Sequence, residues 1–154
     1  MPVIIHRIYI DAPSSLCFDL ARNIDVHMET TSETGERAVG GKTEGLMEKG
    51  DTVTWEAKHL GVRQRLTAQI VEMERPTMFT DVMVKGAFQS FTHVHEFHEH
   101  DNGTIMTDTF SYRSPFGLLG VCADLLFLKR YMRRFIVQRA QELKRIAEEY
   151  KIQR

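Results

Sequence analysis

Apolar and polar residues alternate along most of the middle of the chain, from residue 37 to residue 113. Such alternation is typical of β-strands, because successive side chains point to opposite faces of a sheet. Turn-forming residues interrupt the pattern about every ten residues, as they do in an antiparallel meander. A β-branched run at residues 3–10 predicts one further strand. Two short helices are expected next, one ending at about Arg22 and one running from about Asp25 to before Gly35.

The carboxyl-terminal segment has a different pattern, with apolar residues three or four positions apart from about residue 116 to residue 150. This spacing predicts one long amphipathic helix. Its apolar positions are Leu125, Leu128, Met132, Phe135, Ile136, Ala140, Leu143, Ala147 and Tyr150. The order of elements indicates an α+β fold, with an antiparallel sheet of about seven strands and a carboxyl-terminal helix long enough to lie across it.

A two-residue hairpin turn is predicted at Leu60 and Gly61, between strands at residues 52–59 and 62–71. The register that follows pairs Trp55 with Leu66, Ala57 with Gln64, and His59 with Val62. All other polar residues of this hairpin fall on the opposite face. His59 and Gln64 are therefore polar exceptions on the face of Trp55.

Asp108 is the other polar exception on an apolar face. The strand at residues 105–112 places Met106, Phe110 and Tyr112 on the same side as Asp108, and these large apolar groups predict that this side faces the interior. A carboxylate in such a position costs free energy unless it has a partner or water.

The preceding strand offers partners for Asp108, because Phe91, His93, His95 and Phe97 lie on its matching face. Two registers remain open. A turn at Asn102-Gly103 would set Phe97 opposite Asp108, whereas a turn at Asp101-Asn102 would set His95 opposite Asp108. In both registers a buried acid lies beside histidines.

An inner sheet face that mixes aromatic walls with a few convergent polar groups is typical of a small-molecule cavity. We expect this cavity under the long helix, with a small hydrophobic ligand as its occupant. The candidate ligand-binding residues are Trp55, His59, Gln64, Phe91, His93, His95, Asp108, Phe110 and Tyr112. His27 and Arg37 fall near one end of this cavity, where either a ligand contact or a surface role is open.

Asp108 with His95 or His93 is also a candidate catalytic acid–base pair, since a carboxylate can hold an imidazole in one tautomer. A metal site is not expected, because His98 and His100 point away from His93 and His95 on their strand. No motif for a cofactor or a nucleophile accompanies these residues.

Composition adds few constraints. The 154 residues are expected to form a single domain, 1–154, and the net charge of −1 indicates neither nucleic acid nor an anionic membrane as a partner. The apolar run at residues 118–128 is too short for stable membrane insertion, and no signal peptide precedes the first strand. A cytoplasmic protein with two buried free thiols, Cys17 and Cys122, is therefore expected. The basic group Lys129, Arg130, Arg133 and Arg134 is expected to be solvated rather than bound to lipid head groups.

Several local motifs resemble those of the SRPBCC, or START-like helix-grip, superfamily. They are TGERAV (34–39), GDTVTW (50–55), HLGVRQRL (59–66), GAF (86–88), HVHEF (93–97), GTIMTD (103–108) and YRSPFGLLG (112–120). The superfamily includes pathogenesis-related allergens, polyketide cyclases and coenzyme-Q-binding proteins, and this chain resembles a bacterial branch of it.

The resemblance covers nearly the whole chain and implies a sheet that grips the carboxyl-terminal helix, with a ligand between them. Binding of a hydrophobic or amphipathic small molecule, such as a lipid, an isoprenoid or an aromatic metabolite, is the expected function. Two alternatives stay open, because one scaffold can carry several functions. One is a cyclase, dehydratase or hydrolase that uses the His/Asp pair, and the other is an interaction protein with a vestigial cavity.

Overall fold

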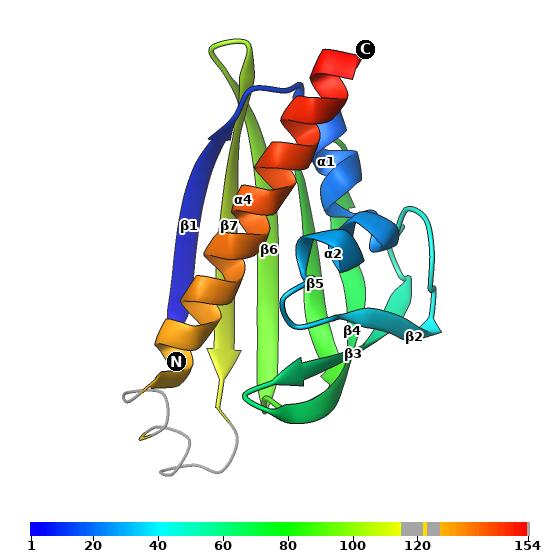
Figure 1. Cartoon of the computed structure of the whole chain (residues 1–154), viewed down its shortest axis with the longest axis vertical. Helices are drawn as coiled ribbons and strands as arrows, with labels where there is room; N and C mark the ends of the chain where they lie inside the picture. Colours follow the sequence, from blue (N-terminus) through cyan, green and yellow to red (C-terminus); the bar gives the residue numbers. More distant parts are fainter. Residues whose placement is uncertain (115–121, 123–126, 154) are drawn as a thin grey trace.

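The computed structural model describes residues 1–114, 122 and 127–153 (Figure 1). One antiparallel sheet has the strand order β1-β7-β6-β5-β4-β3-β2. Its strands are β1 (Val3–Ile10), β2 (Arg37–Gly41), β3 (Thr52–His59), β4 (Val62–Glu74), β5 (Met78–Lys85), β6 (Ser90–His100) and β7 (Gly103–Arg113). The predicted antiparallel sheet is therefore confirmed, and β4 extends three residues beyond the predicted end at residue 71.

Three helices of the described residues complete the fold: α1 (Ser14–Ala21), α2 (Ile24–Thr30) and α4 (Lys129–Gln153). The two short helices after the first strand and the long carboxyl-terminal helix are confirmed. The predicted start of the long helix near residue 116, and Leu125 within it, lie outside the described residues.

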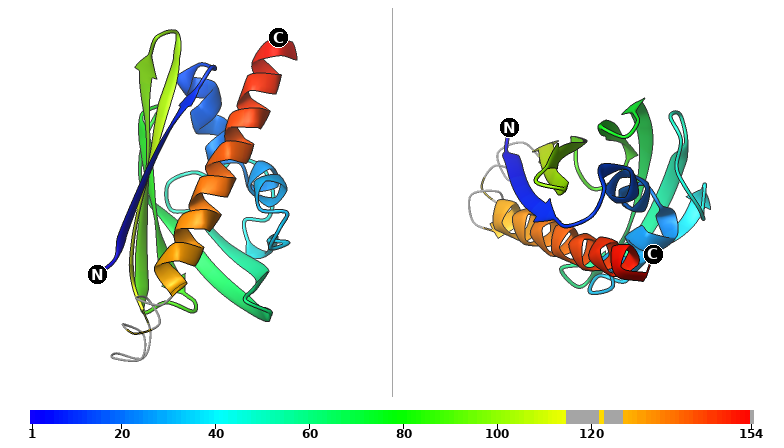
Figure 2. Two further views of the ribbon diagram at one scale, coloured as in Figure 1. Left: turned by 60° about the vertical axis from the view of Figure 1, so that its left-hand side comes forward. Right: turned by 90° about the horizontal axis from the view of Figure 1, so that it is seen from above.

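The sheet is strongly curved, and α4 crosses its concave side with α1 and α2 beside it (Figure 2). The helix packs most closely against β1, α1 and α2. Its buried residues are Met132, Ile136, Ala140, Leu143, Ile146 and Ala147, whereas Tyr150, a predicted apolar-face position, is 46% exposed. These contacts place α4 against the β1 edge of the sheet and the two short helices.

The β3–β4 hairpin has the predicted register, with Trp55 opposite Leu66, Ala57 opposite Gln64 and His59 opposite Val62. Leu60 and Gly61 form its turn, both with positive φ angles. Leu60 lies at φ 51°, in the left-handed region that two-residue hairpin turns require.

The β6–β7 hairpin settles the choice between the two predicted registers. His100 pairs with Gly103, so Asp101 and Asn102 form the turn, with φ angles of 46° and 64°. Aspartate and asparagine tolerate this left-handed conformation better than most residues. The register with Phe97 opposite Asp108 is wrong, and His95 lies opposite Asp108.

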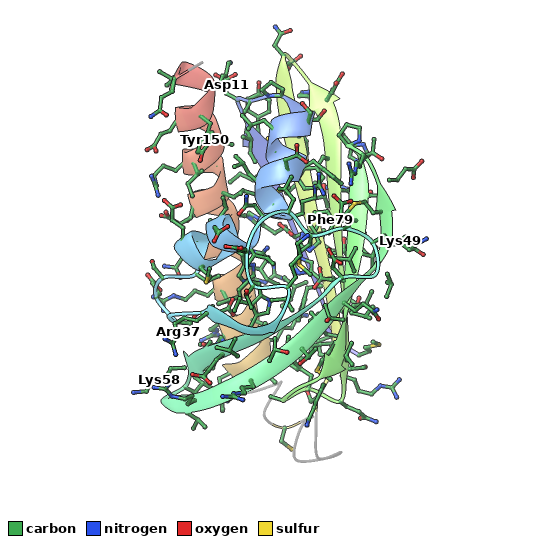
Figure 3. The ribbon with its side chains drawn as sticks, turned by 90° about the vertical axis from the view of Figure 1, so that its right-hand side faces the viewer. Asp11, Arg37, Lys49, Lys58, Phe79 and Tyr150 are labelled. Atoms are coloured by element: carbon green, nitrogen blue, oxygen red, sulfur yellow. The ribbon has the colours of Figure 1, made fainter. Side chains whose placement is uncertain are left out.

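Large apolar side chains fill the two ends of the space between sheet and helices. Phe18 of α1 packs edge-on against Phe79 and Phe97, with ring centroids 5.6 Å from each (Figure 3 labels Phe79). Toward the other end, Phe91 and Phe110 pack with Met132 and Ile136 of α4. The polar residues described below lie between these two clusters.

Cysteine burial differs from the expectation at one position. Both thiols are free, and Cys17 is buried, but Cys122 is exposed. The apolar neighbours of Cys122 in the sequence had suggested a buried thiol, and local apolarity alone does not decide which segment is covered. No helix of the described residues is both long and apolar enough to cross a membrane.

Candidate functional site

A cavity of about 370 Å³ lies between the curved sheet and α4. Its apolar wall consists of side chains from β3, β4, β6, β7, the β5–β6 turn and α4: Trp55, Leu66, Phe88, Phe91, Phe110, Met132 and Phe135. Polar and charged side chains also line it, among them His27, Glu36, His59, Asp81, His93, Tyr131 and Arg139. The volume lies within the range of cavities that hold drug-sized ligands.

Six of the nine candidate ligand-binding residues line this cavity: Trp55, His59, Gln64, Phe91, His93 and Phe110. His95 and Asp108 instead line a small adjoining space of about 20 Å³ beside His93. Tyr112 is fully buried and packs against Phe88, with ring centroids 5.2 Å apart. Its side chain therefore lies behind the aromatic wall rather than on the cavity surface.

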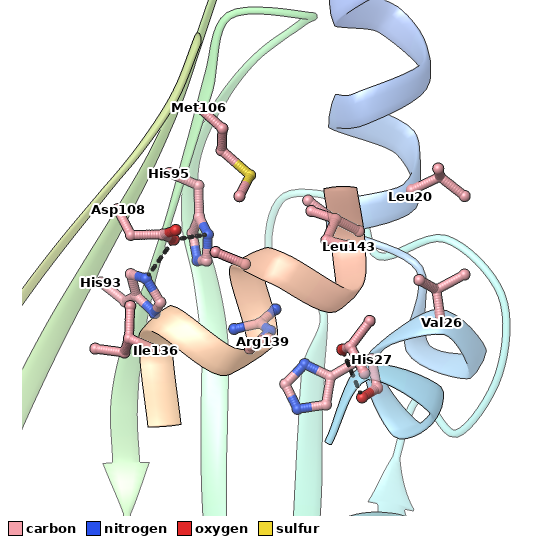
Figure 4. Close-up of a pocket in the computed structure, with 13 residues that line it drawn as sticks. Leu20, Val26, His27, His93, His95, Met106, Asp108, Ile136, Arg139 and Leu143 are labelled. Atoms are coloured by element: carbon pink, nitrogen blue, oxygen red, sulfur yellow. Dashed lines mark hydrogen bonds and ion pairs between the residues drawn. The ribbon is translucent and has the colours of Figure 1, made fainter. Parts of the chain in front are cut away.

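Three buried polar side chains and the part-buried Asp81 form one connected network across β5, β6 and β7 (Figure 4 shows the three buried ones). Nε2 of His93 lies 2.9 Å from Oδ1 of Asp108, and Nδ1 of His95 lies 3.2 Å from the same oxygen. On its other side, Nε2 of His95 lies 2.8 Å from Oδ1 of Asp81. The order Asp81–His95–Asp108–His93 alternates acid and imidazole, so each buried carboxylate has at least one partner.

The pKa values of the two histidines in this network shift in opposite directions. Burial acts to lower the pKa of His95, but hydrogen bonds to Asp108 and Asp81 outweigh it and raise that pKa. Burial lowers the pKa of His93, and the neighbouring His95 adds to this effect. Burial acts to raise the pKa of Asp108, yet the hydrogen bonds from both histidines hold it below its usual range. The arrangement favours an ionised Asp108, a protonated His95 and a neutral His93.

A second polar group lies on the same cavity, formed by His27, Glu36, His59 and Tyr131. Nε2 of His27 makes a close contact with Oε2 of Glu36, and Nε2 of His59 lies 3.8 Å from Oε1 of Glu36. Nδ1 of His59 lies 2.6 Å from the Tyr131 hydroxyl, which joins β3 to α4. The His27 ring stacks on Trp55, with centroids 4.0 Å apart. His27 thus lines the cavity, whereas Arg37 is exposed and pairs with Glu56.

Sequence reasoning missed Asp81, Glu36 and Arg139. Asp81 carried the same signal as Asp108, because it lies between Phe79 and Met83 on an alternating strand. Arg139 also carried a signal, three residues after Ile136 and four before Leu143 on the apolar stripe of the helix. Glu36 carried none, since it directly follows a turn and precedes a short strand.

Asp81, His93 and His95 have the residue types of a metal site, and their potential ligand atoms lie within 4.8 Å of one another. Their geometry does not suit one ion. The two imidazole rings stack with centroids 3.8 Å apart at 27°, so their in-plane lone pairs do not converge on one point. Both nitrogens of His95 already face carboxylates. An ion at this position would have to displace those contacts and turn at least one ring.

Comparison with solved structures identifies the fold. The chain is similar to the protein TTHA0849 from Thermus thermophilus, with 17% identity over 94% of this chain and 95% of that one, and a TM-score of 0.78. It is also similar to ginseng major latex-like protein 151 from Panax ginseng, with 12% identity, coverages of 95% and 97%, and a TM-score of 0.71. The protein CV1439 from Chromobacterium violaceum matches at 9% identity, with coverages of 95% and 96% and a TM-score of 0.68.

Neither a family model nor a curated protein sequence matches the chain. At these low identities the likeness to solved structures shows the fold. The chain shares the fold of these structures, in which an antiparallel sheet surrounds a long carboxyl-terminal helix, as its sequence motifs led us to expect.

Proposed function

We propose that this protein binds a hydrophobic or amphipathic small molecule, such as a lipid, an isoprenoid or an aromatic metabolite, between the sheet and α4. The observation that carries the proposal is the cavity of about 370 Å³, whose lining combines large aromatic and other apolar side chains with several polar ones. Burial of apolar ligand surface there would contribute about 25 cal/mol per Å².

The proposed roles of the lining residues follow from their chemistry. Trp55, Phe91 and Phe110 would cover the apolar body of the ligand, as large rigid rings do in binding sites. His59, Gln64 and His93 would orient its polar end. His95 and Asp108 would hold His93 in place, and Tyr112 would support the aromatic wall from behind.

The direct test is native mass spectrometry of the purified protein, followed by solvent extraction and identification of released molecules. A bound apolar molecule in stoichiometric amount is the expected result. Trp55 provides a second readout, because it is the only tryptophan in the chain and it lines the cavity. Titration with the extracted molecule should change its fluorescence saturably. A protein that carries nothing and shows no saturable response to lipid, isoprenoid and aromatic probes would contradict the proposal.

An acid–base enzyme is the second candidate, and one observation favours it. His93 lines the cavity, and its Nε2 faces the ionised Asp108, so the hydrogen on Nε2 is donated to the carboxylate and Nδ1 carries the lone pair. None of the described residues forms a hydrogen bond with Nδ1. A neutral imidazole oriented in this way can remove a proton from a bound ligand, and Asp108 would stabilise the imidazolium that forms.

Turnover and binding can be separated by substitution. The extracted ligand is incubated with the wild type, with His93→Gln and with Asp108→Asn, and products are sought by liquid chromatography and mass spectrometry. Loss of product with retained ligand binding in both variants would support the enzyme. Unchanged ligand after prolonged incubation with the wild type would leave binding as the function.

A further inference from the structure

Arg139 projects from the middle of α4 into the space between the sheet and the helices (Figure 4). It lines the main cavity and also three smaller spaces around it, of about 20, 50 and 210 Å³. In the view of Figure 4 its guanidinium lies between the His93–His95 group and His27. Arg139 is therefore placed where the spaces between the sheet, α2 and α4 meet.

The guanidinium has no hydrogen bond or ion pair with any of the residues that the structure describes. Its nitrogens are nevertheless not sealed off by protein atoms, because they are absent from the buried polar atoms that lack a partner. A guanidinium carries five N–H donors and no acceptor. In a cavity of limited volume these donors need acceptors, and the described protein atoms supply none.

Its positive charge, in contrast, is already compensated. Glu36 and Asp81 line the same cavity as Arg139, and Asp108 lines the adjoining space of about 20 Å³ with it. Burial acts to raise the pKa of Asp81, but the His95 hydrogen bond and nearby positive charges, Arg139 among them, lower it. The same balance, with His27 as the main partner, lowers the pKa of Glu36. Burial lowers the pKa of His27, so this imidazole contributes a hydrogen bond to Glu36 but no charge. The three carboxylates with lowered pKa values therefore outnumber the two cations, Arg139 and His95.

A ligand carboxylate would add a fourth anion to this end of the cavity, and like charges in a buried site repel strongly. An uncharged oxygen would instead accept hydrogen bonds without adding charge. We infer that Arg139 recognises a neutral acceptor, such as a ketone, ester or quinone carbonyl, at the polar end of the bound molecule. This inference rests on the proposed binding function and names the class of head group that the cavity selects.

Three probes of one ring size test it by isothermal titration calorimetry, with protein in the syringe because the probes are poorly soluble: 2-acetylnaphthalene, 2-naphthoate and naphthalene. On the wild type the ketone should bind about tenfold more tightly than naphthalene, since a hydrogen bond to a charged donor contributes that much. The naphthoate should bind more weakly than the ketone. In Arg139→Met the ratio of ketone to naphthalene affinity should fall to near one.

Arg139→Gln is the matched variant, because it removes the charge but keeps an N–H donor. It should retain part of the preference for the ketone, and it also serves if Arg139→Met fails to fold by circular dichroism. A ketone preference that is unchanged in both variants would overturn the assignment of Arg139. Tighter binding of naphthoate than of ketone to the wild type, lost in Arg139→Gln, would show an anion site instead. Absence of binding by all three probes would contradict the cavity function itself, and the assignment with it.

Discussion

His93 reaches Asp108 diagonally across two strands: Nε2 of His93 lies 2.9 Å from Oδ1 of Asp108, although His95 is the residue directly opposite Asp108. The same oxygen thus faces both histidines: His95, which pairs directly with Asp108, and His93, which lies two residues earlier on β6. Because His93 also lines the cavity, this diagonal contact connects a buried acid to the surface that a ligand would meet.

Removal of the Asp108 carboxylate should destabilise the folded protein. Asp108→Asn is expected to lower the free energy of unfolding by about 3 kcal/mol or more, because it leaves buried imidazoles without their ionic partner. Urea unfolding at pH 6 measures the change. Asp101→Asn is the matched control, since Asp101 lies in a turn with a side chain that is 82% exposed. It should change stability by no more than about 0.5 kcal/mol, and an equal loss in both variants would contradict the role of burial.

The difference in stability between the wild type and Asp108→Asn should depend on pH. The pKa of Asp108 is lowered from 3.8, so its stabilisation is present above that pH and is lost as the pH falls. The pKa of His95 is raised from 6.5, so its stabilisation is complete below that pH and is lost as the pH rises through the raised value.

The two windows overlap between the ordinary values of 3.8 and 6.5, where both partners are charged. The difference should therefore be largest near pH 5 and smaller near pH 3 and pH 8. Urea unfolding of both proteins across this range provides the measurement. A difference that stays constant from pH 3 to pH 8 would show that the ion pair does not contribute as described.

Filling the cavity should block ligand binding without damage to the fold. Ala57 lines the cavity next to Trp55 on the same strand face, so Ala57→Phe would place a ring in the space assigned to the ligand. Because the site has room, the cost in stability should stay below about 1.5 kcal/mol. Probe affinity, measured by Trp55 fluorescence, should fall at least about tenfold, which corresponds to roughly 1.4 kcal/mol.

Val71→Phe is the control for this substitution, since Val71 lies on the adjacent strand with a side chain that is 37% exposed. It introduces the same ring outside the cavity and should leave probe affinity within about twofold of the wild type. Equal affinity of the wild type and Ala57→Phe would place the ligand elsewhere.

The two thiols should differ sharply in reactivity. Burial raises the pKa of Cys17 to about 11, so its reactive thiolate is scarce at pH 8, whereas Cys122 is exposed. One equivalent of thiol should react rapidly with 5,5′-dithiobis(2-nitrobenzoic acid) in the folded protein, and the second only after unfolding in urea. The rapid phase should disappear in Cys122→Ser. Two rapid equivalents in the native wild type would contradict the burial of Cys17.

Most of the fold could be predicted because its determinants are local. The alternation of side chains specifies strands, the spacing of turn residues separates them, and the three- and four-residue steps specify the long helix. Leu60 and Gly61 determined the β3–β4 register because a two-residue turn allows only one pairing. The β6–β7 turn left two pairings, and backbone angles at Asp101 and Asn102 chose between them.

The candidate site residues also divide into those that a local sequence pattern could reveal and those that only the tertiary structure brings to the site. Asp108, His93 and His95 could be found, since each stands out against the pattern of its own strand. Glu36 carried no signal in the sequence, and Arg139 stood out only by its position on the apolar stripe of its helix. The two line one cavity because the start of β2 and the middle of α4, more than one hundred residues apart in the sequence, lie on the same space. Tyr112 shares the face of Asp108, yet it is fully buried against Phe88 and does not line the cavity.

By itself the sequence determined the elements, their order and the inward face of each strand, since these depend on side-chain periodicity and turn chemistry. Only the tertiary structure decided how far α4 stands from the curved sheet, and hence that a cavity of about 370 Å³ remains between them. It also decided which charges meet there. Sheet curvature and helix docking arise from packing among residues distant in the chain, and such packing leaves no local pattern to read.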